Sequence, residues 1–162
     1  MIALCEDADV ERMYEVINAA ARAYERVIPP DRWHEPYMPL EELRSEIEDG
    51  VVFLGYSDGG ELLGVMGSQE VQDVTLIRHA YVRTIEQHRG IGGALLAHLL
   101  ARASTPLLVG TWVAAAWAVR FYEHRGFELV TPAEKNRLLR RYWTVPERQI
   151  ETSVVLARGW TD

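Results

Sequence analysis

The segment Gln87-His88-Arg89-Gly90-Ile91-Gly92-Gly93-Ala94 joins a β-rich stretch to an amphipathic helical pattern. The first amides of a helix have no partner within it, and glycines allow a ligand to approach the backbone closely. A phosphate group at this point would meet free N–H groups and the positive end of the helix dipole. Arg89 is available for a charge-assisted contact. The segment therefore predicts a loop that binds a phosphate-bearing ligand.

Two other phosphate-binding loops do not fit these residues. A Walker loop needs a lysine and then Ser or Thr after its last glycine, whereas this chain continues Gly93-Ala94-Leu95. A dinucleotide fingerprint that starts at Gly90 needs a small residue where Leu95 stands, and it follows the first strand of a βαβ unit. Here the preceding chain has the pattern of a hairpin, so both readings are excluded.

The rest of the chain predicts one α/β domain that covers residues 1–162. Ser57-Asp58-Gly59-Gly60 indicates a hairpin, and Thr131-Pro132-Ala133-Glu134 indicates the start of a helix. A crossover helix after Val82 follows an antiparallel front half. Apolar periodicity predicts strands at 2–4, 51–56, 62–71, 74–82, 107–112, 127–130 and 150–156, and helices at 10–24, 40–48, 90–105, 114–122 and 132–141.

Composition limits the classes of function. The net charge of −7 argues against nucleic-acid binding, and no apolar stretch approaches the ~20 residues of a membrane span. Cys5 is the only cysteine and the chain opens with no leader pattern, so we expect a cytoplasmic protein. His34, His98 and His124 have no metal-ligand spacing, and we expect no metal. Residues 78–89 are locally basic, which indicates either an anion site or a basic edge balanced elsewhere.

A second motif, Phe121-Tyr122-Glu123-His124-Arg125-Gly126-Phe127, follows further along the chain. Together the two motifs resemble the GNAT superfamily of N-acetyltransferases. That family's loop reads Gln/Arg-x-x-Gly-x-Gly/Ala, matched by Gln87, Gly90 and Gly92, and its later helix ends in an aromatic-Tyr pair, three spacers and Gly-Phe. The resemblance extends over most of the chain, although only residues 81–127 are specific. It implies a mixed, mostly antiparallel sheet of about seven strands with helices on both faces.

The resemblance also implies acetyl-coenzyme A as the cosubstrate. Strand residues Ala80-Tyr81-Val82 are expected to splay away from strand 107–112 and leave backbone groups free for the pantetheine arm. The family often has an asparagine seven residues before the tyrosine, and this chain has Ala115, so that contact is missing or supplied elsewhere. The cofactor-binding residues implied are Tyr81, Val82, Gln87, His88, Arg89, Gly90, Ile91, Gly92 and Gly93.

Two proton transfers must be assigned. A primary amine has a pKa near ~10.4, so a base must remove its proton at neutral pH, and His79 or Glu70 acting through water is the candidate. The resemblance makes Tyr122 the general acid at the departing thiolate. The alternative is a core tyrosine packed beside Phe121. We expect direct attack by the amine, because Cys5 lies away from both motifs.

The acceptor site is less defined. Strand alternation places Arg78 and His79 on opposite faces. Arg78 shares the parity of Ala80 and Val82, which the family resemblance directs toward the active site. We expect Arg78 either to hold a substrate carboxylate or to pair with an acid. Trp33, Tyr37 and Trp143 are candidates for acceptor walls that hold an amine by cation–π contact, or for plugs of the core or a homodimer interface.

Three functions follow from these residues. The first is acetylation of a small-molecule or amino-acid-like amine. The second is acetylation of a protein amine, which would need an open groove, whereas segments 29–39 and 131–146 are placed to cover the site. The third is a non-catalytic module that binds acyl-coenzyme A and acts through a partner.

Overall fold

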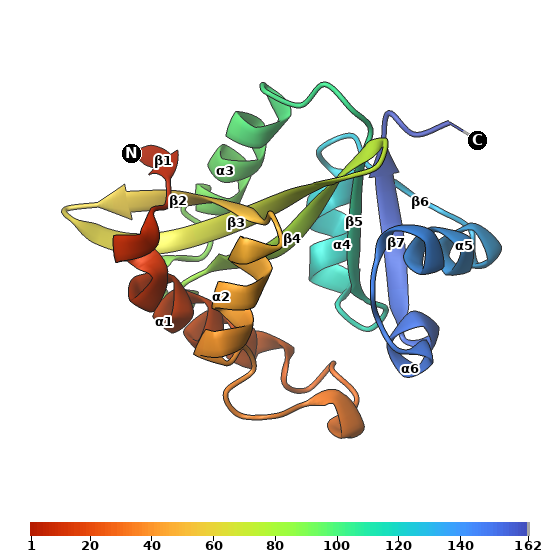
Figure 1. Cartoon of the computed structure of the whole chain (residues 1–162), viewed down its shortest axis with the longest axis horizontal. Helices are drawn as coiled ribbons and strands as arrows, with labels where there is room; N and C mark the ends of the chain where they lie inside the picture. The colour runs from red at the N-terminus through yellow and green to blue at the C-terminus, as the bar shows by residue number, and fades with distance from the viewer. Residues whose placement is uncertain (162) are drawn as a thin grey trace.

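The chain folds into one seven-stranded mixed sheet, which a computed structural model describes for residues 1–161 (Figure 1). The strand order is β1-β2-β3-β4-β5-β7-β6, and every neighbouring pair is antiparallel except β4 and β5. The predicted mixed, mostly antiparallel sheet is confirmed. The strands are β1 Ile2–Leu4, β2 Val52–Asp58, β3 Glu61–Val71, β4 Val74–Val82, β5 Leu107–Trp112, β6 Glu128–Leu129 and β7 Ser153–Arg158.

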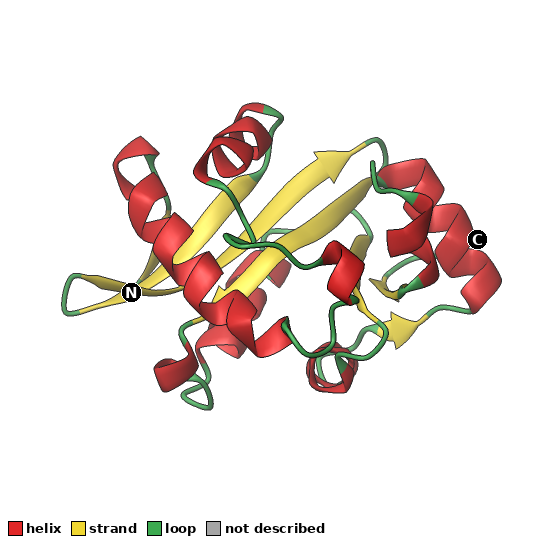
Figure 2. Ribbon diagram, turned by 90° about the horizontal axis from the view of Figure 1, so that it is seen from below, coloured by secondary structure: helices red, strands yellow, loops and turns green. Residues whose placement is uncertain are grey.

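Helices lie on both sides of this sheet (Figure 2). They are α1 Val10–Ala21, α2 Leu40–Glu48, α3 Ile91–Leu100, α4 Ala116–Glu123, α5 Pro132–Tyr142 and α6 Glu147–Glu151, with 3-10 turns at Asp7–Asp9, Arg22–Tyr24, Pro30–Arg32 and Thr84–Glu86. Apolar residues of α3 and α4 pack on one face, against Met66, Ile77 and Val109. On the other face α1 and α2 pack near Phe53, and α5 and α6 pack near Leu108. None of these helices is long and apolar enough to span a membrane within the described residues.

Strands β4 and β5 separate part-way along their length. They pair only through Thr75↔Leu107, Leu76↔Leu108 and Ile77↔Val109. Beyond this point β5 continues beside β7, with Gly110 opposite Val155. The backbone of β4 after Ile77 therefore faces a gap instead of a partner strand on that side, which is the splay that the family resemblance implied.

A β-bulge distorts β4 beside this gap. The β3–β4 register shifts between Val65, which faces Tyr81, and Gly67, which faces Arg78. His79 takes a left-handed backbone conformation with φ 55°, which is unusual for a residue with a side chain. A bulge interrupts strand alternation, because two residues on one strand oppose one on its neighbour. The prediction that Arg78 and His79 point to opposite faces is wrong, since both side chains contact Glu46.

The last predicted strand begins later than expected. Residues 147–151 form α6, and β7 starts only at Ser153. Pro146 caps the helix, and its carbonyl accepts hydrogen bonds from the amides of Gln149 and Ile150. Ile150 is buried although it lies in a helix, so its apolar character is explained without a strand at this position. Other predicted elements are present, with ends shifted by a few residues.

Candidate active site

The loop after β4 presents a row of unpaired amides. Gly90 adopts a left-handed conformation with φ 78° and stands directly before α3. The first helical hydrogen bond runs from the Ala94 amide to the Gly90 carbonyl, at 2.9 Å. Within residues 1–161, the amides from His88 to Gly93 donate to no protein acceptor. Unpaired amides at a helix start are suited to hold an anion such as a diphosphate.

These amides border a cavity of about 380 Å³ between β4, α3 and α4, which we call the loop cavity. Eight of the nine residues predicted to bind the cofactor line it, namely Tyr81, Val82, Gln87, His88, Gly90, Ile91, Gly92 and Gly93. Arg89 is the exception. Its guanidinium contacts Glu86 and lies 3.5 Å from Asp58, and its side chain is about half exposed. The loop therefore fits a phosphate through its backbone, while the Arg89 side chain is held elsewhere.

A second cavity of about 160 Å³, which we call the acceptor cavity, opens in the gap between β4 and β5. Four of the predicted acceptor or base residues line it: Arg78, His79, Tyr37 and Trp143. Tyr24, Ala80, Tyr81, Ala118 and Tyr122 line both cavities. The two spaces therefore meet at these side chains.

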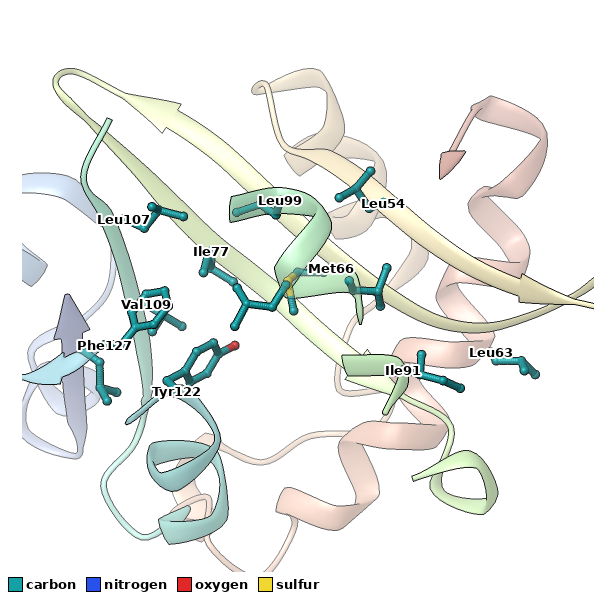
Figure 3. Close-up of a cluster of buried hydrophobic side chains, with 13 residues drawn as sticks. Leu54, Leu63, Met66, Ile77, Ile91, Leu99, Leu107, Val109, Tyr122 and Phe127 are labelled. Carbon is teal, nitrogen blue, oxygen red and sulfur yellow. The ribbon is translucent and has the colours of Figure 1, made fainter. Parts of the chain in front are cut away.

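Tyr122 is both a core residue and a cavity residue. Its side chain is 5% exposed, and its ring makes edge-to-face contacts with Phe121 and Phe127 at centroid distances of 5.0 and 5.4 Å. Figure 3 shows it directed from α4 towards the sheet, among apolar side chains. Burial, with a smaller contribution from Tyr24, raises the pKa of Tyr122. The hydroxyl therefore keeps its proton at neutral pH, and Tyr122 is a proton donor among the residues that line both cavities.

His79 and Arg78 share one carboxylate. Arg78 Nη2 donates to Glu46 Oε1 at 2.9 Å, and His79 Nε2 contacts Glu46 Oε2. Arg78 Nη1 also donates to Gln69 Oε1 at 3.0 Å. Burial alone would raise the pKa of Glu46, but the His79 hydrogen bond and the charges of His79 and Arg78 together lower it. Of the two alternatives for Arg78, the structure shows pairing with an acid.

The remaining predicted residues lie outside both cavities. Glu70 is exposed and faces Thr75 near the β3–β4 turn. Trp33 stacks on Tyr37, with ring centroids 5.6 Å apart, but is not among the residues that line the 160 Å³ cavity. Within residues 1–161 no cluster of three or more side chains has the arrangement of a metal site.

Comparison with known proteins places this geometry in a family. The model of the acetyltransferase (GNAT) domain family matches residues 8–140. The chain belongs to the GNAT acetyltransferases. Among curated proteins no relative matches this acetyltransferase.

Solved structures share the fold of this GNAT acetyltransferase at low sequence identity. The PaiA N-acetyltransferase of Thermoplasma acidophilum, in complex with coenzyme A, is 17% identical with a TM-score of 0.73, covering 99% of this chain and 98% of that one. The ribosomal-protein-S18-alanine N-acetyltransferase of Escherichia coli is 18% identical with a TM-score of 0.68, covering 98% and 92%. The putative acetyltransferase YncA of Salmonella typhimurium, with acetyl-CoA, is 20% identical with a TM-score of 0.63, covering 81% and 80%.

The GNAT acetyltransferase site also contains residues that sequence reasoning missed. Trp117, two residues after the buried Ala115, packs on Tyr24 with ring centroids 5.1 Å apart, and both rings line the 380 Å³ cavity. Glu46 and Arg125 were also overlooked. A helix aromatic such as Tyr24 has no distinctive motif, and Glu46 is one acid among many on α2. Only Arg125, inside the second motif, carried a sequence signal that could have been used.

Proposed function

We propose that this acetyltransferase transfers the acetyl group of acetyl-coenzyme A to the primary amine of a small molecule bound in the 160 Å³ cavity. The observation that carries the proposal is the position of Tyr122, a buried tyrosine that lines both the loop cavity and the acceptor cavity. A donor at such a junction can serve a thioester that reaches it from one side and an amine that reaches it from the other. Two of the solved relatives contain coenzyme A or acetyl-CoA, which supports the choice of donor.

The cosubstrate is held mainly by the backbone. The free amides from His88 to Gly93 bind the diphosphate, and the unpaired edge of β4 after Ile77 binds the pantetheine arm. Acetyl-coenzyme A supplies an acetyl group already activated as a thioester. Ala115 stands where the family resemblance places an asparagine, and Tyr24 and Trp117 form the wall of the cavity along which the arm would lie.

His79 is the base in this proposal. Its ring lines the acceptor cavity, and Glu46 contacts Nε2, which leaves Nδ1 as the atom free to accept a proton from the amine. Tyr122 then supplies the hydroxyl proton at the sulfur. Glu70 is not assigned a role, because its side chain is exposed and lies outside the acceptor cavity.

The acceptor cavity favours an amine with an aromatic or apolar body. Its walls include Tyr24, Tyr37, Trp112 and Trp143. The guanidinium of Arg78 is already paired with Glu46, so no unpaired Lys or Arg side chain remains among the described lining residues to bind a substrate carboxylate. The small volume favours a free amine over the end of a protein chain. We therefore propose an arylalkylamine or alkylamine in preference to an amino acid or a peptide.

A panel of amines with a colorimetric readout of free coenzyme A thiol tests this proposal. Phenethylamine and phenylalanine form a matched pair that differs by one carboxylate, and a short peptide with a free N-terminus represents the protein acceptor. We expect at least ~10-fold higher kcat/KM for phenethylamine, because phenylalanine would bury an unpaired carboxylate. Turnover of the peptide alone would show a protein acetyltransferase. Binding of acetyl-coenzyme A without any turnover would favour the non-catalytic module.

The base is tested separately with two variants. His79→Gln is expected to lower turnover at neutral pH and to recover part of it at alkaline pH, where the amine loses its proton without help. Glu70→Gln is expected to turn over like the wild type. If Glu70→Gln lost turnover at neutral pH and His79→Gln did not, Glu70 would be the base.

A further inference from the structure

Arg125 places a guanidinium in the wall of the loop cavity. It lies three residues after Tyr122, just beyond the C-cap of α4, and its side chain reaches α3. Its Nη1 donates to the Phe121 carbonyl at 2.9 Å, and its Cζ lies 3.9 Å from the centre of the Phe121 ring. These contacts fix the guanidinium plane but involve only uncharged groups. Within residues 1–161 Arg125 forms no ion pair.

Gly93 is what allows this approach. A β-carbon at position 93 would lie 2.8 Å from Arg125 Nη2 and 3.4 Å from Nε, closer than packed atoms allow. Gly93 is the third residue of α3, and its amide is one of the free donors of the loop. The family motif does not require glycine here, so the contact with Arg125 gives this glycine a physical reason. The guanidinium therefore lies beside the free amides.

The loop's own arginine is not available for the same task. Arg89 contacts Glu86 and Asp58, and its side chain lines the surface outside the cavity. Among the side chains that line the cavity, the charged or imidazole groups are Glu86, His88 and Arg125, and Glu86 is the partner of Arg89. Arg125 is thus the permanent cation that faces the space beside the amides.

We infer that Arg125 binds a phosphate of acetyl-coenzyme A and supplies the positive charge that the loop sequence leads us to expect from Arg89. Coenzyme A offers two sources of phosphate, the diphosphate and the 3′-phosphate. An Arg held rigidly by a carbonyl and a ring loses little freedom when it forms charge-assisted hydrogen bonds. The inference rests on the proposed use of acetyl-coenzyme A, but not on the acceptor or on the base.

Isothermal titration calorimetry with coenzyme A tests the inference without any acceptor. Arg125→Ala is expected to weaken binding by about 10- to 100-fold, the usual effect of losing hydrogen bonds to a charged group. Arg102→Ala is the matched control, because Arg102 is exposed at the other end of α3 and donates only to His98 O. Should Arg125→Ala fold poorly, Arg125→Gln and Arg125→Lys provide a pair that differs in charge, and only Gln should lose affinity strongly.

Two further ligands separate the sources. If dephospho-coenzyme A shows the same loss with Arg125→Ala, Arg125 contacts the diphosphate; if the loss disappears, Arg125 contacts the 3′-phosphate. Pantetheine carries no phosphate, and its binding, followed by chemical-shift changes, should not respond to Arg125→Ala. An equal loss for pantetheine would show an effect through Phe121 packing and overturn the inference. So would a larger loss in Arg89→Ala than in Arg125→Ala. A wild-type protein that does not bind coenzyme A would instead refute the proposed function.

Discussion

Gly67 on β3 lies directly opposite Arg78 on β4, and a β-carbon at position 67 would stand 2.7 Å from the Arg78 carbonyl oxygen. The same β-carbon would lie 3.0 Å from the Phe53 ring and 3.1 Å from Val51. The two strands can approach closely here only because residue 67 has no side chain. This close approach adjoins the bulge at His79, which brings Arg78 and His79 to one carboxylate.

Gly67→Ala should therefore destabilise the protein and disturb the acceptor site. Overpacking of a closed site typically costs ~1 to 3 kcal/mol, and here the neighbours are backbone and core atoms that cannot move freely. Gly110→Ala on β5 is the control, because its β-carbon would be 3.7 Å from its nearest neighbour, on Trp143. We expect that control to stay within ~1 kcal/mol of the wild type. Urea unfolding of both variants measures the difference, and equal stabilities would refute the packing argument.

The Glu46 carboxylate should contribute to stability in a pH-dependent way. Its pKa in the folded chain is lowered from the ordinary 4.5 by His79 and Arg78, which overcome the opposing effect of burial. A lowered pKa means stability that is present above pH 4.5 and is lost as pH falls through the lowered value. Glu46→Gln should therefore be less stable than the wild type at neutral pH, and this difference should shrink below pH 4.5.

Urea unfolding at several pH values measures this effect. Glu48→Gln, at an exposed position of the same helix, is the matched control. If the difference in unfolding free energy between Glu46→Gln and the wild type stayed constant at every pH down to the most acidic value measured, the side chain would stabilise the fold by its shape and not by its charge.

Cys5 should be unreactive in the folded protein. Burial, with a smaller contribution from Asp9, raises the pKa of its thiol from 9.0 to about 11, although Arg12 opposes the change. The thiolate is the reacting form, so alkylation by iodoacetamide at pH 8 should be at least ~10-fold slower in folded than in urea-unfolded protein. The folded rate should continue to rise beyond pH 9. Cys5→Ala should keep the turnover rate of the wild type. A loss of turnover would favour a mechanism in which Cys5 is the nucleophile over direct attack by the amine.

The parts of the structure that could be predicted depend on local signals. The free amides before α3 follow from the glycines of the loop, and the positions of the strands along the chain follow from short apolar runs with turn residues between them. The bulge at His79 could not be predicted, because it depends on how β4 pairs with β3, where Gly67 permits a close approach that no pattern within β4 reveals. The contact between Glu46 and Arg78 joins residues 32 positions apart.

Two other errors have physical causes of the same kind. Ile150 fits both a strand and a helix pattern, and the Pro146 cap decides between them. The position of Arg89 in the loop predicts a phosphate contact, but its side chain is turned towards Asp58 and Glu86, and the loop sequence does not reveal these partners.

The central claim is that the Tyr122 hydroxyl, at the junction of the two cavities, supplies the proton for acetyl transfer. The most direct measurement compares wild type and Tyr122→Phe for acetyl-coenzyme A affinity and for kcat with the amine that the panel selects. Phenylalanine keeps the ring contacts with Phe121 and Phe127, so binding should change by less than about threefold while kcat falls by at least ~100-fold. A Tyr122→Phe protein with the kcat of the wild type would contradict the account.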